Sequence, residues 1–324
     1  MRPLLPFAVL LFACSAAIDG ELATVRCADE GAYGPPACAP GETCHGGVCA
    51  ALGAPVGHEC ANDEDCASPA TCADGAQLGL GSVLRCVVPC CSSAECGEPG
   101  DGNVCRTMKS GGGSVCWPAS DLGEGAGGEL QLGDTGPGGA CVAASECRSG
   151  ACDTGRCVDT CCADSSCTAS ERICRAGQSA VGEGWYCGFA PTEQSGIGEC
   201  ATASDCVTGE CVTVEDAKVC LAPCCSSREC GTVELKAGTY QLACALSASG
   251  ARGCVGRVDQ QATLGVGAAC KIGNDCRSGL CVDDGDGKFC SDFCCDDASC
   301  GDTKQFSCRP RPTGNAWALR CVRN

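Results

Sequence analysis

The sequence predicts a small disulfide-rich fold, a tandem array of cysteine-stapled modules with short β-hairpins and little helix. The chain has 324 residues and 41 cysteines, a content typical of disulfide scaffolds. Large apolar side chains are scarce, with six Phe, three Trp and three Tyr, so one large apolar core is not expected. Two adjacent cysteines, four other residues and a further cysteine recur four times, as CCSSAEC, CCADSSC, CCSSREC and CCDDASC.

The cysteine spacing divides the chain into four repeats of nine cysteines, preceded by a four-cysteine module. The first half of each repeat opens with two cysteines that have five other residues between them. The second half opens in the same way, with one extra cysteine directly after the first. The expected segments are a signal peptide over 1–17, an N-terminal module over 18–59, repeat 1 over 60–118, a Gly-rich linker over 119–140, repeat 2 over 141–190, repeat 3 over 191–256 and repeat 4 over 257–324.

Turn residues mark where the modules fold back on themselves. Ser-Gly or Thr-Gly stands between two cysteines in 145–152, 204–211 and 274–281. The apolar segments 279–282 and 287–290 flank an Asp-Asp-Gly-Asp turn, which predicts a β-hairpin. No stretch has the apolar period of an amphipathic helix.

The nine cysteines of a repeat cannot all pair within that repeat, because nine is odd. The extra thiol could pair with another repeat, pair with another chain or stay free. We favour bonds between repeats through one member of each vicinal pair, which would stiffen the array into a rod. The four cysteines of each half allow three pairings, which the sequence leaves open. The vicinal cysteines are Cys90, Cys91, Cys161, Cys162, Cys224, Cys225, Cys294 and Cys295.

The first seventeen residues have the pattern of a secretory signal: one Arg, an apolar run and small residues. Leu11-Phe12-Ala13-Cys14 resembles a bacterial lipobox, although Phe12 departs from it, so Cys14 is the expected lipid anchor. Ordinary cleavage after Ala17 is the alternative. Either route predicts an extracytoplasmic protein, an outer-membrane or cell-surface lipoprotein or otherwise a secreted one, where disulfides are stable.

No residue pattern predicts a catalytic, cofactor-binding or metal site, so we expect no enzyme and no cofactor. The chain has no C-x-x-C motif and only two His, which argues against structural zinc and thioredoxin-like exchange. Residues 283–287 are rich in Asp but lack the Glu that closes an EF-hand loop, which favours a solvated turn.

Aromatic and Arg residues recur near the end of the repeats and could be contact residues, since both types dominate binding hot spots. Arg follows the eighth cysteine in three repeats, as Arg106, Arg175 and Arg309. The alternative, which we favour for the aromatics, is that each Trp caps a small core. The candidate contact aromatics are Trp117, Trp185 and Trp317.

The formal charge of −18 argues against nucleic acid and against an anionic membrane surface as partners. An acidic coat that keeps an exported protein soluble is the simpler explanation. The expected partner is an unknown protein or surface ligand, with membrane contact only through the lipid anchor.

The pattern C-x3-[SN]-[DE]-C-x-[ST]-G-x-C, clearest in 200–211 and 270–281, resembles the cysteine-rich repeats of uncharacterised exported proteins of predatory Gram-negative bacteria, including myxobacteria. The C-x5-C clusters are also similar to those of the Dickkopf cysteine-rich domain. Whey-acidic-protein inhibitor domains share a vicinal pair but differ in its spacing. The resemblance implies an exported repeat protein and no known activity.

These observations predict an exported, non-enzymatic repeat protein that acts in cell-surface structure, adhesion or ligand binding. The alternative is a secreted inhibitor or toxin-like ligand of a foreign enzyme or receptor. A lipid on Cys14 would favour the first function, and a freely secreted form the second.

Overall fold

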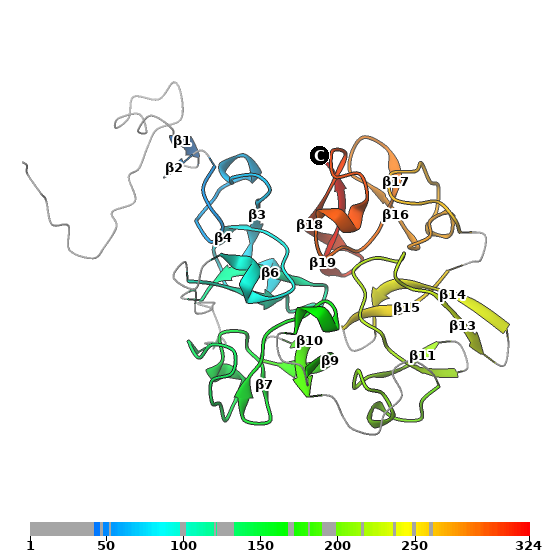
Figure 1. Ribbon diagram of the computed structural model, residues 1–324. Coiled ribbons are helices and arrows are strands. Elements are labelled where there is room, and N and C mark those ends of the chain that lie inside the picture. Colours follow the sequence, from blue (N-terminus) through cyan, green and yellow to red (C-terminus); the bar gives the residue numbers. More distant parts are fainter. Residues whose placement is uncertain are drawn as a thin grey trace, which may run out of the picture. The chain divides into compact units, whose positions relative to one another are not determined.

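The computed structural model describes residues 42–45, 48–51, 53–97, 102–119, 121, 133–167, 172–180, 182–189, 199–214, 217–235, 238–247, 251–258 and 262–324 (Figure 1). The chain divides into two compact units, residues 1–50 and 51–324. Strands β1 (Glu42–His45) and β2 (Val48–Ala51), at the end of the first unit, pair with each other. The predicted signal peptide and Cys14 lie outside the described residues.

Antiparallel hairpins dominate the second unit, which confirms the predicted fold class. Each repeat contains two hairpins, and the second hairpin of repeat 3 gains a third strand. The pairs are β3 (Thr71–Asp74) with β4 (Leu84–Val87), β5 (Asn103–Thr107) with β6 (Ser114–Pro118), β7 (Cys152–Asp153) with β8 (Arg156–Cys157), β9 (Arg172–Ser179) with β10 (Gly182–Phe189), β11 (Cys211–Val214) with β12 (Ala217–Cys220), β14 (Gly238–Leu246) with both β13 (Thr232–Leu235) and β15 (Arg252–Val258), β16 (Leu280–Asp283) with β17 (Lys288–Ser291), and β18 (Phe306–Thr313) with β19 (Ala316–Arg323).

Helix is limited to short pieces between cysteines. Among the described residues the one α-helix is α1 (Gly75–Leu78), a single turn. Seven of the eight loops that join two cysteines separated by five residues contain a 3₁₀ turn, and the loop from Cys224 to Cys230 forms an ordinary turn instead. The 3₁₀ turns are η1 (Asp63–Asp65), η2 (Ser93–Cys96), η4 (Ala144–Glu146), η5 (Asp164–Ser166), η6 (Ala203–Asp205), η7 (Gly273–Asp275) and η8 (Asp297–Cys300).

With the extra vicinal cysteine left out of the count, the disulfides follow one rule in every half-repeat: the first cysteine bonds the third, and the second bonds the fourth. In repeat 1, Cys60 bonds Cys72 while Cys66 bonds Cys86. Cys72 and Cys86 face each other across the hairpin, yet each bonds back to the preceding loop rather than to the other. Each module is therefore a hairpin stapled to its own loop, which covers the little apolar surface that so short a segment can bury.

The acidic residue before the second cysteine has a structural role in the loops of the first half-repeats. The Asp275 carboxylate accepts hydrogen bonds from the backbone N–H groups of Lys271 and Ile272, at 2.8 and 3.1 Å. Asp205 does the same for Ala201 and Thr202, both at 2.8 Å. These bonds satisfy donors that the short 3₁₀ turn leaves unpaired, which explains the acid in the repeat pattern.

The Gly of the Ser-Gly and Thr-Gly turns has a left-handed backbone. Gly150, Gly209 and Gly279 have φ values of 72°, 78° and 74°. Side chains with a Cβ rarely adopt this conformation, so the turn position requires Gly.

Contacts between repeats contradict the predicted rod. The largest apolar cluster combines Leu78 and Trp117 of repeat 1 with Phe289 and Leu319 of repeat 4. A second cluster joins repeats 2 and 3, and a third joins repeats 3 and 4. In a rod each repeat would contact only its neighbours in sequence, whereas here the fourth repeat packs against the first. Single repeats have too little apolar area, and shared clusters bury more of it.

Candidate functional site at the junction of the repeats

The two members of each vicinal pair form different kinds of disulfide. The first member of each pair bonds within its own module, as Cys90 does with Cys105. The second member crosses to another repeat. These crossing bonds are Cys91–Cys162 and Cys225–Cys295. The prediction of bonds between repeats through one member of each pair is thereby confirmed, and all nine cysteines of every repeat are paired.

The two crossing disulfides lie side by side. Their four Sγ atoms all lie within 4.8 Å of one another. Each of the four repeats contributes one sulfur, and we call these four residues the junction cysteines. They are Cys91, Cys162, Cys225 and Cys295.

The loop residue before the next cysteine holds the backbone of each junction cysteine. The N–H of Cys91 donates to Glu95 Oε2 at 3.1 Å, and the N–H of Cys225 donates to Glu229 Oε2 at 2.9 Å. Ser166 and Ser299 accept in the same way in the other two repeats, both at 3.4 Å. The junction cysteines are thus positioned by their own modules.

Arg252 of repeat 3 lies beside the junction cysteines and contacts the neighbouring repeats. Its Nη1 donates to the carbonyl of Cys294 at 2.6 Å, and its Nη2 contacts Cys295 Sγ at 2.8 Å. Its own carbonyl accepts the indole N–H of Trp185 from repeat 2. The side chain is only 3% exposed, and its Nε has no hydrogen-bond partner among the described residues. Burial lowers the pKa of Arg252 to about 10.

A matched pair of Asp residues, Asp159 half-buried and Asp292 buried, supports the same junction. Asp159 of repeat 2 accepts from the N–H and hydroxyl of Ser93 in repeat 1, at 2.9 and 2.8 Å. Asp292 of repeat 4 accepts from the N–H and hydroxyl of Ser227 in repeat 3, at 2.9 and 2.7 Å. Burial raises the pKa of both carboxyls, that of Asp292 to about 6. Repeats 1 and 2 are therefore joined by the same contacts as repeats 3 and 4.

Two of the three candidate contact aromatics are buried. Trp117 is fully buried in the cluster shared by repeats 1 and 4, and Trp185 is 6% exposed. Trp317 is half-buried and packs against the same cluster as Trp117. The core interpretation is confirmed for Trp117 and Trp185, which are too deeply buried to contact a partner.

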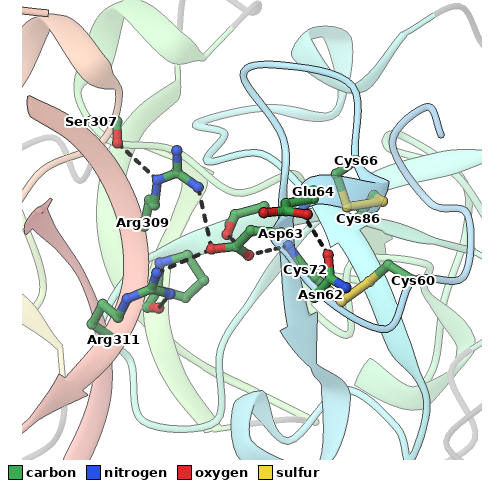
Figure 2. A network of polar contacts seen from close by, with 12 residues as sticks. Cys60, Asn62, Asp63, Glu64, Cys66, Cys72, Cys86, Ser307, Arg309 and Arg311 are labelled. Atoms are coloured by element: carbon green, nitrogen blue, oxygen red, sulfur yellow. Dashed lines mark hydrogen bonds and ion pairs between the residues drawn. A yellow bond between two sulfur atoms is a disulfide. The ribbon is translucent and has the colours of Figure 1, made fainter. Parts of the chain in front are cut away.

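The recurring Arg residues have three different environments. Arg106 is buried and donates to three backbone carbonyls, one of them that of Arg148 in repeat 2. Arg309 lies 3.6 Å from Asp63 of repeat 1. Figure 2 shows Arg309 and Arg311 extending from β18 toward Asp63, which adds a polar contact between repeats 4 and 1.

Arg175 lines a small open pocket of about 190 Å³ within repeat 2. Asp153, Gln178 and Tyr186 line the same pocket. Two of its polar atoms, Asp153 Oδ2 and Arg175 Nε, make no hydrogen bond to any residue that the structure describes. A carboxylate and a guanidinium that line one hollow can bind a small polar group.

The Asp-rich turn at 283–287 is a turn between β16 and β17, where Asp284 pairs with Arg320 at 2.8 Å. The sequence pointed to the vicinal cysteines but neither to their convergence nor to Arg252. Arg252 follows no repeat pattern, so no signal in the sequence pointed to it.

No family model, curated protein or solved structure matches the chain. The many disulfides indicate an extracytoplasmic location, since they persist in oxidising compartments. Over the described ranges, no helix has the length and apolar character needed to cross a bilayer.

Proposed function

We propose that this chain is an exported, non-enzymatic repeat protein held at the cell surface by a lipid on Cys14, where it serves in envelope structure, adhesion or ligand binding. The observation that carries the proposal is the cross-linked junction. Each repeat has four internal disulfides, and two further disulfides tie the repeats in pairs. A chain fixed in this way resists the unfolding and proteolysis to which a protein outside the cell is exposed.

Ligand binding has a specific place in this proposal, the pocket of repeat 2. Its walls come from two stapled hairpins, β7–β8 and β9–β10, so binding would need little ordering of the chain. Asp153 and Arg175 suit a small ligand that carries both a cationic and an anionic group.

The anchor is tested by intact-mass spectrometry of the exported protein beside a Cys14→Ser variant. We expect a wild-type chain that begins at Cys14, carries added acyl mass and stays in the membrane fraction. The Ser variant should lack the acyl mass. A wild-type chain that begins at Ile18 and is free in the medium would contradict the anchor and favour the secreted inhibitor or toxin-like ligand.

A further inference from the structure

Each junction cysteine belongs to a repeat that is already closed without it. In repeat 1, the disulfides Cys60–Cys72, Cys66–Cys86, Cys90–Cys105 and Cys96–Cys116 staple both hairpins. Breaking the crossing bonds therefore leaves both modules of every repeat stapled. The apolar clusters between repeats 1 and 4 and between repeats 2 and 3 also remain. Four thiols released at the junction would stay close together.

The spacing of these sulfurs is close to that of a metal site. Four thiolates around a tetrahedral Zn²⁺, at about 2.3 Å from the ion, lie about 3.8 Å from one another. The four Sγ atoms here lie within 4.8 Å of one another, two pairs of them bonded. Once the bonds are broken, small side-chain rotations suffice to reach the tetrahedral arrangement.

The positive charge of Arg252 favours the thiolate form of the junction cysteines. Its buried guanidinium contacts Cys295 Sγ, and a disulfide sulfur is a weak acceptor. Glu229 and Asp292 attract its charge, but among the described residues no carboxylate forms an ion pair with it. A thiolate would accept a strong charge-assisted hydrogen bond from the same donor. A neighbouring cation also favours the thiolate form of a cysteine.

Access is adequate for a reductant and an ion. Cys91, Cys162 and Cys225 are half-buried, and only Cys295 is buried. By contrast, the sulfurs of Cys90, Cys96 and Cys105, which also lie close together, belong to a single module. Reduction there would open the hairpin that holds the ligands in place.

We propose that the junction cysteines form a tetrathiolate metal site which, after reduction of their two disulfides, binds one thiophilic cation such as Zn²⁺. Reduction of the two S–S bonds takes four electrons and four protons from two equivalents of a dithiol, each of which becomes a disulfide. Binding of Zn²⁺ then forms four Zn–S bonds and releases four protons. The cation would replace the disulfides as the link between the repeats.

The test uses the wild-type protein under anaerobic conditions. Limited treatment with dithiothreitol, followed by alkylation and peptide mapping, should release four thiols, those of the junction cysteines, before any others. Added Co²⁺ should then bind one ion per chain with the thiolate charge-transfer absorption of a tetrahedral site, and Zn²⁺ should displace it. Native mass spectrometry should show one Zn²⁺ and the intra-repeat disulfides intact.

Two results would overturn the proposal. One is release of the junction thiols together with or after those inside the modules. The other is that the four freed thiols bind no ion, or more than one per chain.

Matched variants locate the site. Replacing Cys225→Ser and Cys295→Ser together removes two ligands, and we expect loss of the tetrahedral Co²⁺ absorption. The control replaces Cys60→Ser and Cys72→Ser, a pair inside repeat 1, and should keep that absorption. In Arg252→Gln, reduction of the two crossing disulfides should need a higher dithiothreitol concentration than in the wild type. In Arg252→Lys, which keeps a positive charge, the concentration needed should lie between those of the wild type and Arg252→Gln.

Discussion

Ser227 and Asp292 bind each other through two hydrogen bonds across the boundary between repeats 3 and 4. The Ser227 hydroxyl donates to Asp292 Oδ1 at 2.7 Å, and its N–H donates to Oδ2 at 2.9 Å. Ser227 is fully buried and Asp292 is 4% exposed. A buried carboxylate of this kind links the packing of two repeats to the pH.

We expect the protein to lose stability as the pH rises through the range in which Asp292 titrates. Burial raises the pKa of Asp292 from 3.8 to about 6, so between these values the folded chain holds a proton that the unfolded chain has released. The stabilising contribution is full below pH 3.8 and is lost as the pH rises through about 6. From about pH 4.5 to about pH 7.5 the free energy of unfolding should fall by on the order of 2 kcal/mol.

Guanidinium unfolding at the two pH values, with disulfides intact, measures this effect. Asp292→Asn should flatten the dependence, leaving the smaller part due to Asp159, whose pKa burial also raises. Asp286→Asn, in an exposed turn, is the control and should keep the wild-type slope. An unchanged slope in Asp292→Asn would show that other groups cause it.

The contact between repeats 1 and 4 should not tolerate a side chain at Gly112. The backbone of Gly112 bridges to Ala318, and its carbonyl accepts from the N–H of Leu319 at 2.9 Å. A Cβ at this position would lie 2.5 Å from the carbonyl oxygen of Trp317. We expect Gly112→Ala to destabilise the protein by about 1–3 kcal/mol, because the clash is with backbone that cannot move alone.

Gly136→Ala is the matched control, because a Cβ there meets no atom within 4 Å. Its effect should stay within about 0.5 kcal/mol. Hydrogen exchange at the Leu319 amide would report the local loss of protection in Gly112→Ala. Equal stability and protection in both variants would argue that the two repeats do not pack through this bridge.

The Asp63 network should stabilise the protein mainly through its short hydrogen bonds. Asp63 Oδ1 accepts from Thr71 at 2.5 Å and from the Cys72 N–H at 2.8 Å, whereas Arg309 and Arg311 lie 3.6 and 3.4 Å from Oδ2 (Figure 2). Burial by itself raises the pKa of Asp63, but these bonds and charges outweigh it and hold the pKa below its usual value.

Two substitutions at Asp63 separate these effects. Asp63→Asn keeps an acceptor oxygen but removes the charge, and should cost less than about 1 kcal/mol because the ion pairs are exposed. Asp63→Ala also removes the hydrogen bonds and should cost about 1–2 kcal/mol more. Denaturant unfolding of both variants, with Arg311→Ala for comparison, measures how much of the stability comes from the charge and how much from the hydrogen bonds. Equal losses in Asp63→Asn and Asp63→Ala would show that the charge dominates.

Local patterns in the sequence were enough to predict the modules. Cysteine density, the turn at 283–287 and the absence of a helical period predicted stapled hairpins, because these features act over a few residues. The odd count of nine predicted one surplus thiol per repeat, because parity does not depend on geometry. Of its three possible fates, the favoured bond between repeats is the one that the structure has. The pairing within a module was not predictable, since Cys72 and Cys86 face each other in β3–β4 and nevertheless bond elsewhere.

The sequence by itself determined that this chain is a set of small covalently closed units with one surplus thiol each. Only the tertiary structure decided where the surplus thiols go. Disulfides join repeat 1 to repeat 2 and repeat 3 to repeat 4. Repeat 4 packs on repeat 1, and Arg252 lies beside Cys295. Such contacts arise between segments far apart in the chain, where burial of shared apolar surface fixes the arrangement and no local spacing records it.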